Sequence, residues 1–189
     1  MKILKKIMFS LIFVSIASVS FAETKMRITL QLPLKAHLGQ NLLVFKKELE
    51  ARSDITVEIY DSAQLYKDKE VPQAVGSGAI EAGVASITRF AGTNPEVDIF
   101  YLPFLFDSES KIRKATSAGS DIRKILDPAI ANTGAVPLYY QAYGSAIMLS
   151  NGGPMKSTAD FKDKKIRVFG KTLGACLLYT SPSPRDLSE

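Results

Sequence analysis

Apolar and polar residues alternate in two short stretches of the chain. The apolar members are Met26, Ile28, Leu30 and Leu32 in the first stretch and Ile55, Val57 and Ile59 in the second. Successive side chains of a strand point to opposite faces of a sheet, so each pattern predicts a half-buried strand. Pro33 marks the end of the first strand, because proline cannot donate a hydrogen bond to a ladder.

Between these strands the apolar spacing is helical. Apolar residues recur every three or four positions at Leu38, Leu42, Phe45 and Leu49. This spacing predicts a helix that runs to about Arg52. After the second strand, Asp68 is the expected cap of a shorter helix over residues 71–75, which Gly76 and Gly78 stop. The small apolar residues 82–87 predict a third, buried strand.

This order of strands and helices predicts a largely parallel sheet. Each connection is long enough for a crossover, which parallel neighbours require. Ligands of such sheets bind beyond the carboxyl ends of the strands. The polar residues at the carboxyl ends of the three strands, or after them, are therefore expected on one edge of the sheet. They are His37, Gln64, Ser86, Thr88 and Arg89.

The second half of the chain is expected to begin with an extended core segment over residues 99–106. Helices are predicted over residues 108–118 and 121–132. The second of these places its isoleucines and leucine on one face. Strands are predicted over residues 135–143 and 146–149. Ser157 or Thr158 is the expected cap of a short helical turn.

Arg167 lies between apolar neighbours in a predicted short strand over residues 166–169. An arginine fixed on a strand can present its planar donors to a carboxylate. A solvent-exposed arginine on an edge strand fits the same pattern. The spacing alone leaves both interpretations open.

Residues 1–22 are expected to be a secretory signal peptide. Three lysines precede an apolar run, and Ser20-Phe21-Ala22 offers small residues to a signal peptidase. Its removal takes Lys2, Lys5 and Lys6 and no acidic residue, so the formal net charge falls from +5 to +2. Nucleic-acid binding then loses its main support, and no nucleic-acid partner is expected. The single cysteine, Cys176, cannot form an internal disulfide, which suits a bacterial periplasm.

Templates for catalysis and cofactor binding are absent from the sequence. One histidine excludes a metal site built on several histidines, and no G-x-S-x-G motif occurs. Gly76-Ser77-Gly78 follows a helix and lacks the Lys-Ser/Thr ending of a phosphate-binding loop. We therefore expect no cofactor and no metal.

The end of the chain, residues 175–189, differs in character from the rest. From Cys176 onward it has neither helical nor strand periodicity, and its Ser-Pro pairs favour turns or disorder. It also resembles the translated adapter run that ends some metagenomic reading frames. We expect a non-native, disordered tail without function.

Several short motifs resemble those of the solute-binding proteins of TRAP transporters, the dicarboxylate-binding DctP family. They are Ala36-His37-Leu38-Gly39, Ser62-Ala63-Gln64-Leu65, Gly76-Ser77-Gly78-Ala79-Ile80-Glu81, Leu102-Pro103-Phe104-Leu105-Phe106 and Lys165-Ile166-Arg167-Val168. Each is short, but their order and spacing together are specific. The resemblance runs from about Lys25 to Gly174.

The resemblance implies an α/β, periplasmic-binding-protein-like fold of two lobes. Lobe one would comprise residues 23–143 and be nearly complete, whereas residues 144–174 would begin a truncated lobe two, since family members are about twice as long. Such a protein closes on a small organic acid in the periplasm and delivers it to membrane permease subunits. The family's carboxylate-binding arginine matches Arg167. The other solute contacts that it implies are His37, Glu70, Ser86, Arg89 and Asn151.

One departure affects the expected solute. Many members carry a second solute-facing arginine where this chain has Ala146. A monocarboxylate or 2-oxo acid is therefore a candidate beside a dicarboxylate. Two other classes stay open: a secreted α/β enzyme that uses Glu70 or His37 as a base, and a secreted structural or adhesion module.

Overall fold

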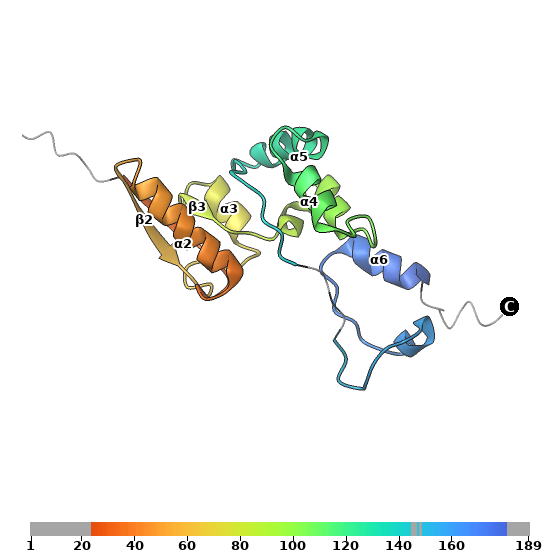
Figure 1. The fold of residues 1–189 in the computed structure, drawn as a ribbon. Helices are drawn as coiled ribbons and strands as arrows, with labels where there is room; N and C mark the ends of the chain where they lie inside the picture. The colour runs from red at the N-terminus through yellow and green to blue at the C-terminus, as the bar shows by residue number, and fades with distance from the viewer. Residues whose placement is uncertain (1–23, 145–146, 148, 181–189) are drawn as a thin grey trace, which may run out of the picture.

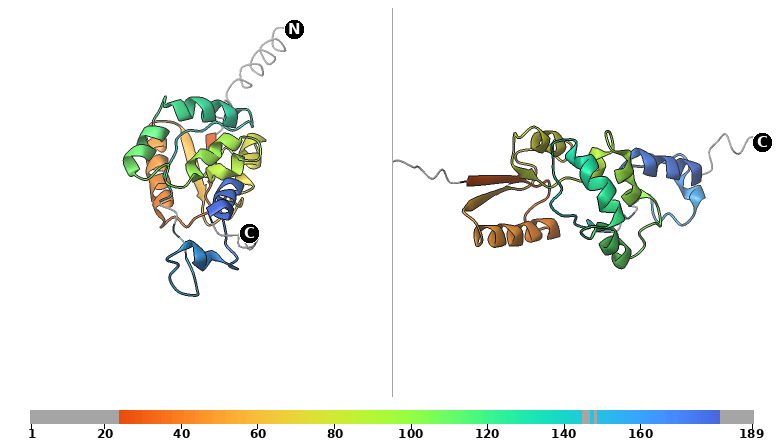
Figure 2. Two further views of the ribbon diagram at one scale, coloured as in Figure 1. Left: turned by 90° about the vertical axis from the view of Figure 1, so that its right-hand side faces the viewer. Right: turned by 90° about the horizontal axis from the view of Figure 1, so that it is seen from above.

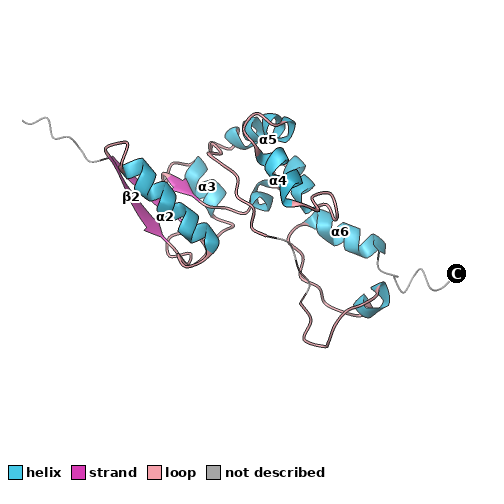
Figure 3. Ribbon diagram, in the orientation of Figure 1, coloured by secondary structure: helices cyan, strands magenta, loops and turns pink. Residues whose placement is uncertain are grey.

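A three-stranded parallel sheet forms the N-terminal part of the computed structural model, which describes residues 24–144, 147 and 149–180 (Figures 1 and 3). Its strands are β1 (Thr24–Thr29), β2 (Ile55–Tyr60) and β3 (Ala82–Gly83), in the order β2-β1-β3 with β1 parallel to both neighbours. Helices α2 (His37–Glu50) and α3 (Val71–Gly76) are the crossovers. The predicted β-α-β-α-β order is thus confirmed, although the third strand ends at Gly83 instead of residue 87 and is not buried. The expected signal peptide lies outside the described residues.

Helices pack on both faces of the sheet, as Figure 2 shows from above. On one face Ile28, Leu30 and Val57 form a buried cluster with two leucines of α2. Each such side chain contributes about 1.5–3 kcal/mol when it is fully buried. On the other face β3 lies against α3, and a Cβ on Gly83 would meet Val71 Cγ1 at 2.5 Å. The third strand therefore needs a glycine at this point.

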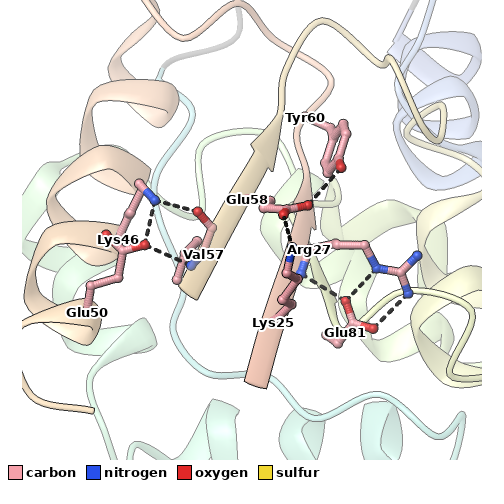
Figure 4. Close-up of polar contacts among 8 residues, drawn as sticks. All are labelled: Lys25, Arg27, Lys46, Glu50, Val57, Glu58, Tyr60 and Glu81. Carbon is pink, nitrogen blue, oxygen red and sulfur yellow. Dashed lines mark hydrogen bonds and ion pairs between the residues drawn. The ribbon is translucent and has the colours of Figure 1, made fainter. Parts of the chain in front are cut away.

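Ion pairs fix the strands to the segments beside them (Figure 4). The Arg27 side chain donates from Nε and Nη2 to the two Glu81 carboxylate oxygens at 2.9 and 2.7 Å, and its backbone N–H donates to Oε2 at 2.8 Å. These bonds hold the pKa of Glu81 down to about 2. On the other side of the sheet, Lys46 Nζ donates to Glu50 Oε1 and to the Val57 carbonyl. The middle of β1 is thus tied to the residue before β3, and the middle of β2 is tied to α2.

Short helices follow the sheet. They are η2 (Ile87–Phe90), η3 (Pro95–Tyr101), α4 (Glu109–Thr116) and α5 (Asp121–Ala131). Ser108 and Ser120 cap α4 and α5 by accepting hydrogen bonds from backbone N–H groups. The two helices predicted here are confirmed. The expected extended core segment over residues 99–106 is wrong, because residues 99–101 complete the 3₁₀ helix η3 that Pro95 opens, and residues 103–105 form a turn in which Phe104 is exposed.

The strand predicted over residues 135–143 is wrong, because this segment has no regular structure. It is held by its side chains instead: Tyr139 packs on Phe45, and Tyr140 donates to Asp127 Oδ1 at 2.8 Å. In the strand predicted over residues 146–149, the described Ile147 and Leu149 are also irregular. An apolar segment becomes a strand only where a neighbour completes the ladder, and the described residues offer none here.

The C-terminal segment contains η4 (Thr158–Phe161) and α6 (Lys171–Thr180). Ser157, one of the two predicted caps, is the cap residue of η4 and forms a capping box with Asp160. The predicted strand over residues 166–169 is irregular. The expected disorder of residues 175–189 is wrong as far as Thr180, since α6 begins at Lys171 and includes residues 175–180, among which Ala175 and Leu177 are good helix formers. Residues 181–189 lie outside the described part.

Candidate functional site

Asp68 joins two loops at the carboxyl edge of the sheet. Its Oδ1 accepts the backbone N–H of Ser86 at 2.8 Å, and its Oδ2 accepts Arg89 Nε at 2.5 Å. The predicted role of Asp68 as a helix cap is wrong. Glu70 occupies the cap position of α3, and the Asp68 carboxylate bonds to the segment after β3 instead. The loop between β2 and α3 is thereby fixed to the turn that follows β3.

Arg89 is held in a way that leaves its terminal nitrogens accessible. Asp68 binds it through Nε, next to the aliphatic part of the side chain. The Arg89 side chain is 38% exposed, whereas that of Asp68 is 17% exposed. Among the described residues neither Nη nitrogen of Arg89 has a hydrogen-bond acceptor. A carboxylate could therefore bind both nitrogens at once.

Arg167 lies on an exposed, irregular segment and reaches the same region through aromatic contacts. Its guanidinium carbon is 5.7 Å from the centre of the Phe169 ring, and that ring is 6.2 Å from the ring of Tyr101. Burial raises the pKa of Tyr101, and a hydrogen bond with Thr88 of η2 acts in the opposite direction. Phe169 thus links the Arg167 segment, through Tyr101, to the turn that contains Arg89.

The remaining predicted contacts are more scattered. His37 begins α2, and its exposed ring meets the edge of Tyr143 with the ring centres 6.0 Å apart. Glu70 accepts the backbone N–H of Lys67 at 3.0 Å, and Asn151 is exposed in a loop. Within the described ranges no hydrogen bond or ring contact connects these three residues to Ser86, Arg89 or Arg167. The position predicted to replace the second arginine, residue 146, lies outside the described residues.

Sequence reasoning missed three residues of this region. Asp68 was assigned to a helix cap, although its place in the loop between β2 and α3 put it on the same edge as Ser86. Tyr101 was assigned to the core, and it is only half-buried. Phe169 was expected to be buried but is 53% exposed. The edge rule could have found Asp68, whereas no sequence signal places Phe169 against Tyr101.

The described part of the chain contains no group of three or more histidine, cysteine or acidic side chains arranged to hold a metal ion. Within the same residues no helix has the length and apolar character needed to cross a bilayer. The chemistry described at the carboxyl edge is that of the Arg89 guanidinium, the Ser86 hydroxyl and the Asp68 carboxylate that holds both residues.

Comparison with known families gives a match over most of the chain. Residues 31–188 match the model of bacterial extracellular solute-binding protein family 7, DctP. The chain belongs to this family. The resemblance found from its short motifs is thus confirmed.

Relatives of this DctP-family chain are longer than the chain itself. It is 30% identical over 115 residues to the C4-dicarboxylate-binding periplasmic protein DctP of Rhodobacter capsulatus, covering 60% of this chain and 34% of that protein. A TRAP periplasmic solute-binding protein from Sulfurospirillum deleyianum, solved with bound succinate, superposes with a TM-score of 0.71 at 24% identity. That match covers 84% of this chain and 52% of the solved one and confirms the fold.

A second solved structure is DctP6 of Bordetella pertussis, an extracytoplasmic solute receptor that binds pyroglutamic acid. It is 26% identical with a TM-score of 0.51, and the match covers 59% of this chain and 36% of that one. The DctP-family chain therefore spans about one third to one half of the lengths of these relatives.

Proposed function

We propose that this chain is the solute-capturing part of a periplasmic binding protein that serves a TRAP-type transporter. It would bind a small organic acid by its carboxylate and deliver it to membrane permease subunits. The family match over residues 31–188 carries this proposal. Carboxylates also bind to the compared proteins: succinate in S. deleyianum, L-malate in Pseudomonas aeruginosa and pyroglutamic acid in B. pertussis.

Arg167 is the proposed carboxylate anchor. Its guanidinium has no anionic partner among the described residues, and its planar fork matches the two oxygens of a carboxylate. Arg89 and Ser86 are proposed as the second set of donors, because Asp68 fixes both at the carboxyl edge. His37, Glu70 and Asn151 are proposed as further contacts that would approach the solute only when the protein closes around it.

Two arginine contacts alone do not make a tight site. A hydrogen bond to a charged group contributes about 1.5–3 kcal/mol, so two contribute about 3–6 kcal/mol. Micromolar binding needs about 8 kcal/mol. Closure of residues 144–174 over residues 23–143, as two lobes, would supply the remainder by excluding water, which strengthens each ion pair.

Calorimetric titration of the protein expressed from its complete gene tests the proposal. The panel contains succinate, L-malate and pyroglutamate, with succinamide as a neutral analogue that keeps the size and loses the charge. Binding of at least one acid, and none of succinamide, is the expected result. An acid that is converted to product during the titration would instead favour the enzyme, and a protein that binds no acid would contradict the proposal.

A further inference from the structure

Asp98 of η3 makes a contact across a long stretch of sequence. Its Oδ2 accepts the hydroxyl of Thr172 at 2.5 Å, although the two residues are 74 positions apart. Thr172 lies in the first turn of α6. The contact therefore attaches the beginning of α6 to the helix that follows η2.

The second oxygen of the same carboxylate faces the residue that precedes α6. A Cβ added to Gly170 would lie 3.6 Å from Asp98 Oδ1 and 3.8 Å from Thr88 Cγ2, so Gly170 packs closely here. Asp98 Oδ1 is buried, and within the described residues it has no hydrogen-bond donor. A carboxylate beside the first residues of a helix is favoured by the partial positive charge of that end. The partial positive charge at the start of α6 thus compensates the negative charge of Asp98 as long as α6 begins beside it.

Asp98 and Tyr101 act on the same short segment from one face of η3. A 3₁₀ helix has three residues per turn, so positions three apart lie above one another. Tyr101 contacts the ring of Phe169, and Asp98 binds Thr172. Residues 169–172 are therefore held at both ends, and Arg167 is only two positions before the first contact.

A cavity of about 410 Å³ adjoins this contact between η3, α5 and α6. Its walls include Ile99, Leu102 and Leu126, with Asp98 and Thr172 at one side. The cavity is open to solvent, and its lining is mainly apolar.

From these contacts we infer that Asp98 is a positioning residue for solute binding, which directs Arg167 toward the Ser86–Arg89 turn by fixing the start of α6. It does not touch the solute. This inference rests on the proposed function, because it assigns Asp98 a role only if Arg167 binds a carboxylate.

Substitutions at Thr172 test the inference in the protein expressed from its complete gene. Thr172→Val keeps the shape and removes the hydroxyl, whereas Thr172→Ser keeps the hydroxyl. The dissociation constant for the panel acid that binds most tightly, with succinate tried first, should rise about tenfold in Thr172→Val, since a charged hydrogen bond is lost. Thr172→Ser should restore binding to near the wild-type value. A helix contact without a positioning role would change thermal unfolding of the solute-free protein and leave this constant alone.

A double-mutant cycle identifies the partner. Asp98→Ala should weaken binding as Thr172→Val does, and the double variant should be no weaker than either, because both remove one interaction. Asp107→Ala is the matched control, since Asp107 pairs with Lys111 on an exposed surface and should leave binding unchanged. Equal affinities of Thr172→Val and Thr172→Ser would overturn the inference. Failure of the wild-type protein to bind any acid would instead contradict the proposed function.

Discussion

The glycine in the motif Ala36-His37-Leu38-Gly39 has a geometric role that a single methyl group tests. Gly39 is buried in the first turn of α2 and packs on the loop that leads out of β1. A Cβ at this position would lie 2.5 Å from the carbonyl oxygen of Leu34 and 2.6 Å from its Cα. Both atoms belong to the backbone, so no side-chain rotation relieves the clash.

The expected effect of Gly39→Ala is the difference between two opposing terms. Overpacking of a closely packed site costs about 1–3 kcal/mol. Alanine in place of glycine inside a helix gains about 0.5–1 kcal/mol. The clash should win, because the Leu34 backbone can move only if the loop between β1 and α2 moves with it. We expect a net loss of about 1–2 kcal/mol in the free energy of unfolding.

Denaturant titration measures this difference, with Gly92→Ala as the matched control. A Cβ at Gly92 meets no atom within 4 Å, so that variant should be as stable as the wild type or slightly more stable. Gly39→Ala should unfold at a lower midpoint with an unchanged slope. Equal midpoints for the two variants would refute the reasoning, because Gly39→Ala would then show no cost from the contact with Leu34.

Two further predictions concern ionisable groups that fix the fold. In the folded protein Arg27 lowers the pKa of Glu81 from 4.5 to about 2, so the stability that this pair provides above about pH 4.5 should be lost toward pH 2. In denaturant titrations, the free energy of unfolding of Glu81→Gln should therefore fall less steeply with decreasing pH. A wild-type decline no steeper than that of Glu81→Gln would contradict this. Burial and the bond to Asp127 raise the pKa of Tyr140. Because Tyr140→Phe removes this bond, it should lower the free energy of unfolding by about 0.5–1.5 kcal/mol, whereas Tyr143→Phe, at an exposed residue, should change it little. Equal urea midpoints for the two variants would count against that bond.

The N-terminal half could be predicted because its elements depend on local periodicity. Alternation over residues 26–32 and helical spacing from Leu38 to Leu49 each place one apolar face, and these faces meet in a single core. The parallel order then follows from the crossover lengths. Even the expected helix end near Arg52 differs by only two residues from the observed end at Glu50.

The later strands could not be predicted in the same way. Residues 135–143 are mostly apolar and aromatic, and Arg167 lies between apolar residues in 166–169, yet hydrogen bonding in a strand depends on a neighbour that a local pattern does not reveal. In the first segment the side chains of Tyr139 and Tyr140 make the contacts instead. Apolar residues thus indicate that a segment packs, but the partner decides its backbone conformation.

The candidate site likewise has residues that the sequence predicts and contacts that it does not. Ser86 and Arg89 follow from the rule that ligands bind at the carboxyl edge of a parallel sheet. The pairings that fix the site were not predictable: the edge rule can place Asp68 at the same edge, but it does not pair Asp68 with Arg89, 21 positions away, or Asp98 with Thr172, 74 positions away. Such pairs are decided by how the elements pack, which no spacing in the sequence encodes.

The role of Arg167 as carboxylate anchor is tested most directly by calorimetric titration of Arg167→Ala, in the protein expressed from its complete gene, with the acid that the wild type binds. Arg113→Ala is the matched control, because Arg113 is an exposed arginine that pairs with Glu109 on α4. We predict that Arg167→Ala shows no measurable binding and unfolds as the wild type does, whereas Arg113→Ala binds normally. Wild-type affinity in Arg167→Ala would contradict the account.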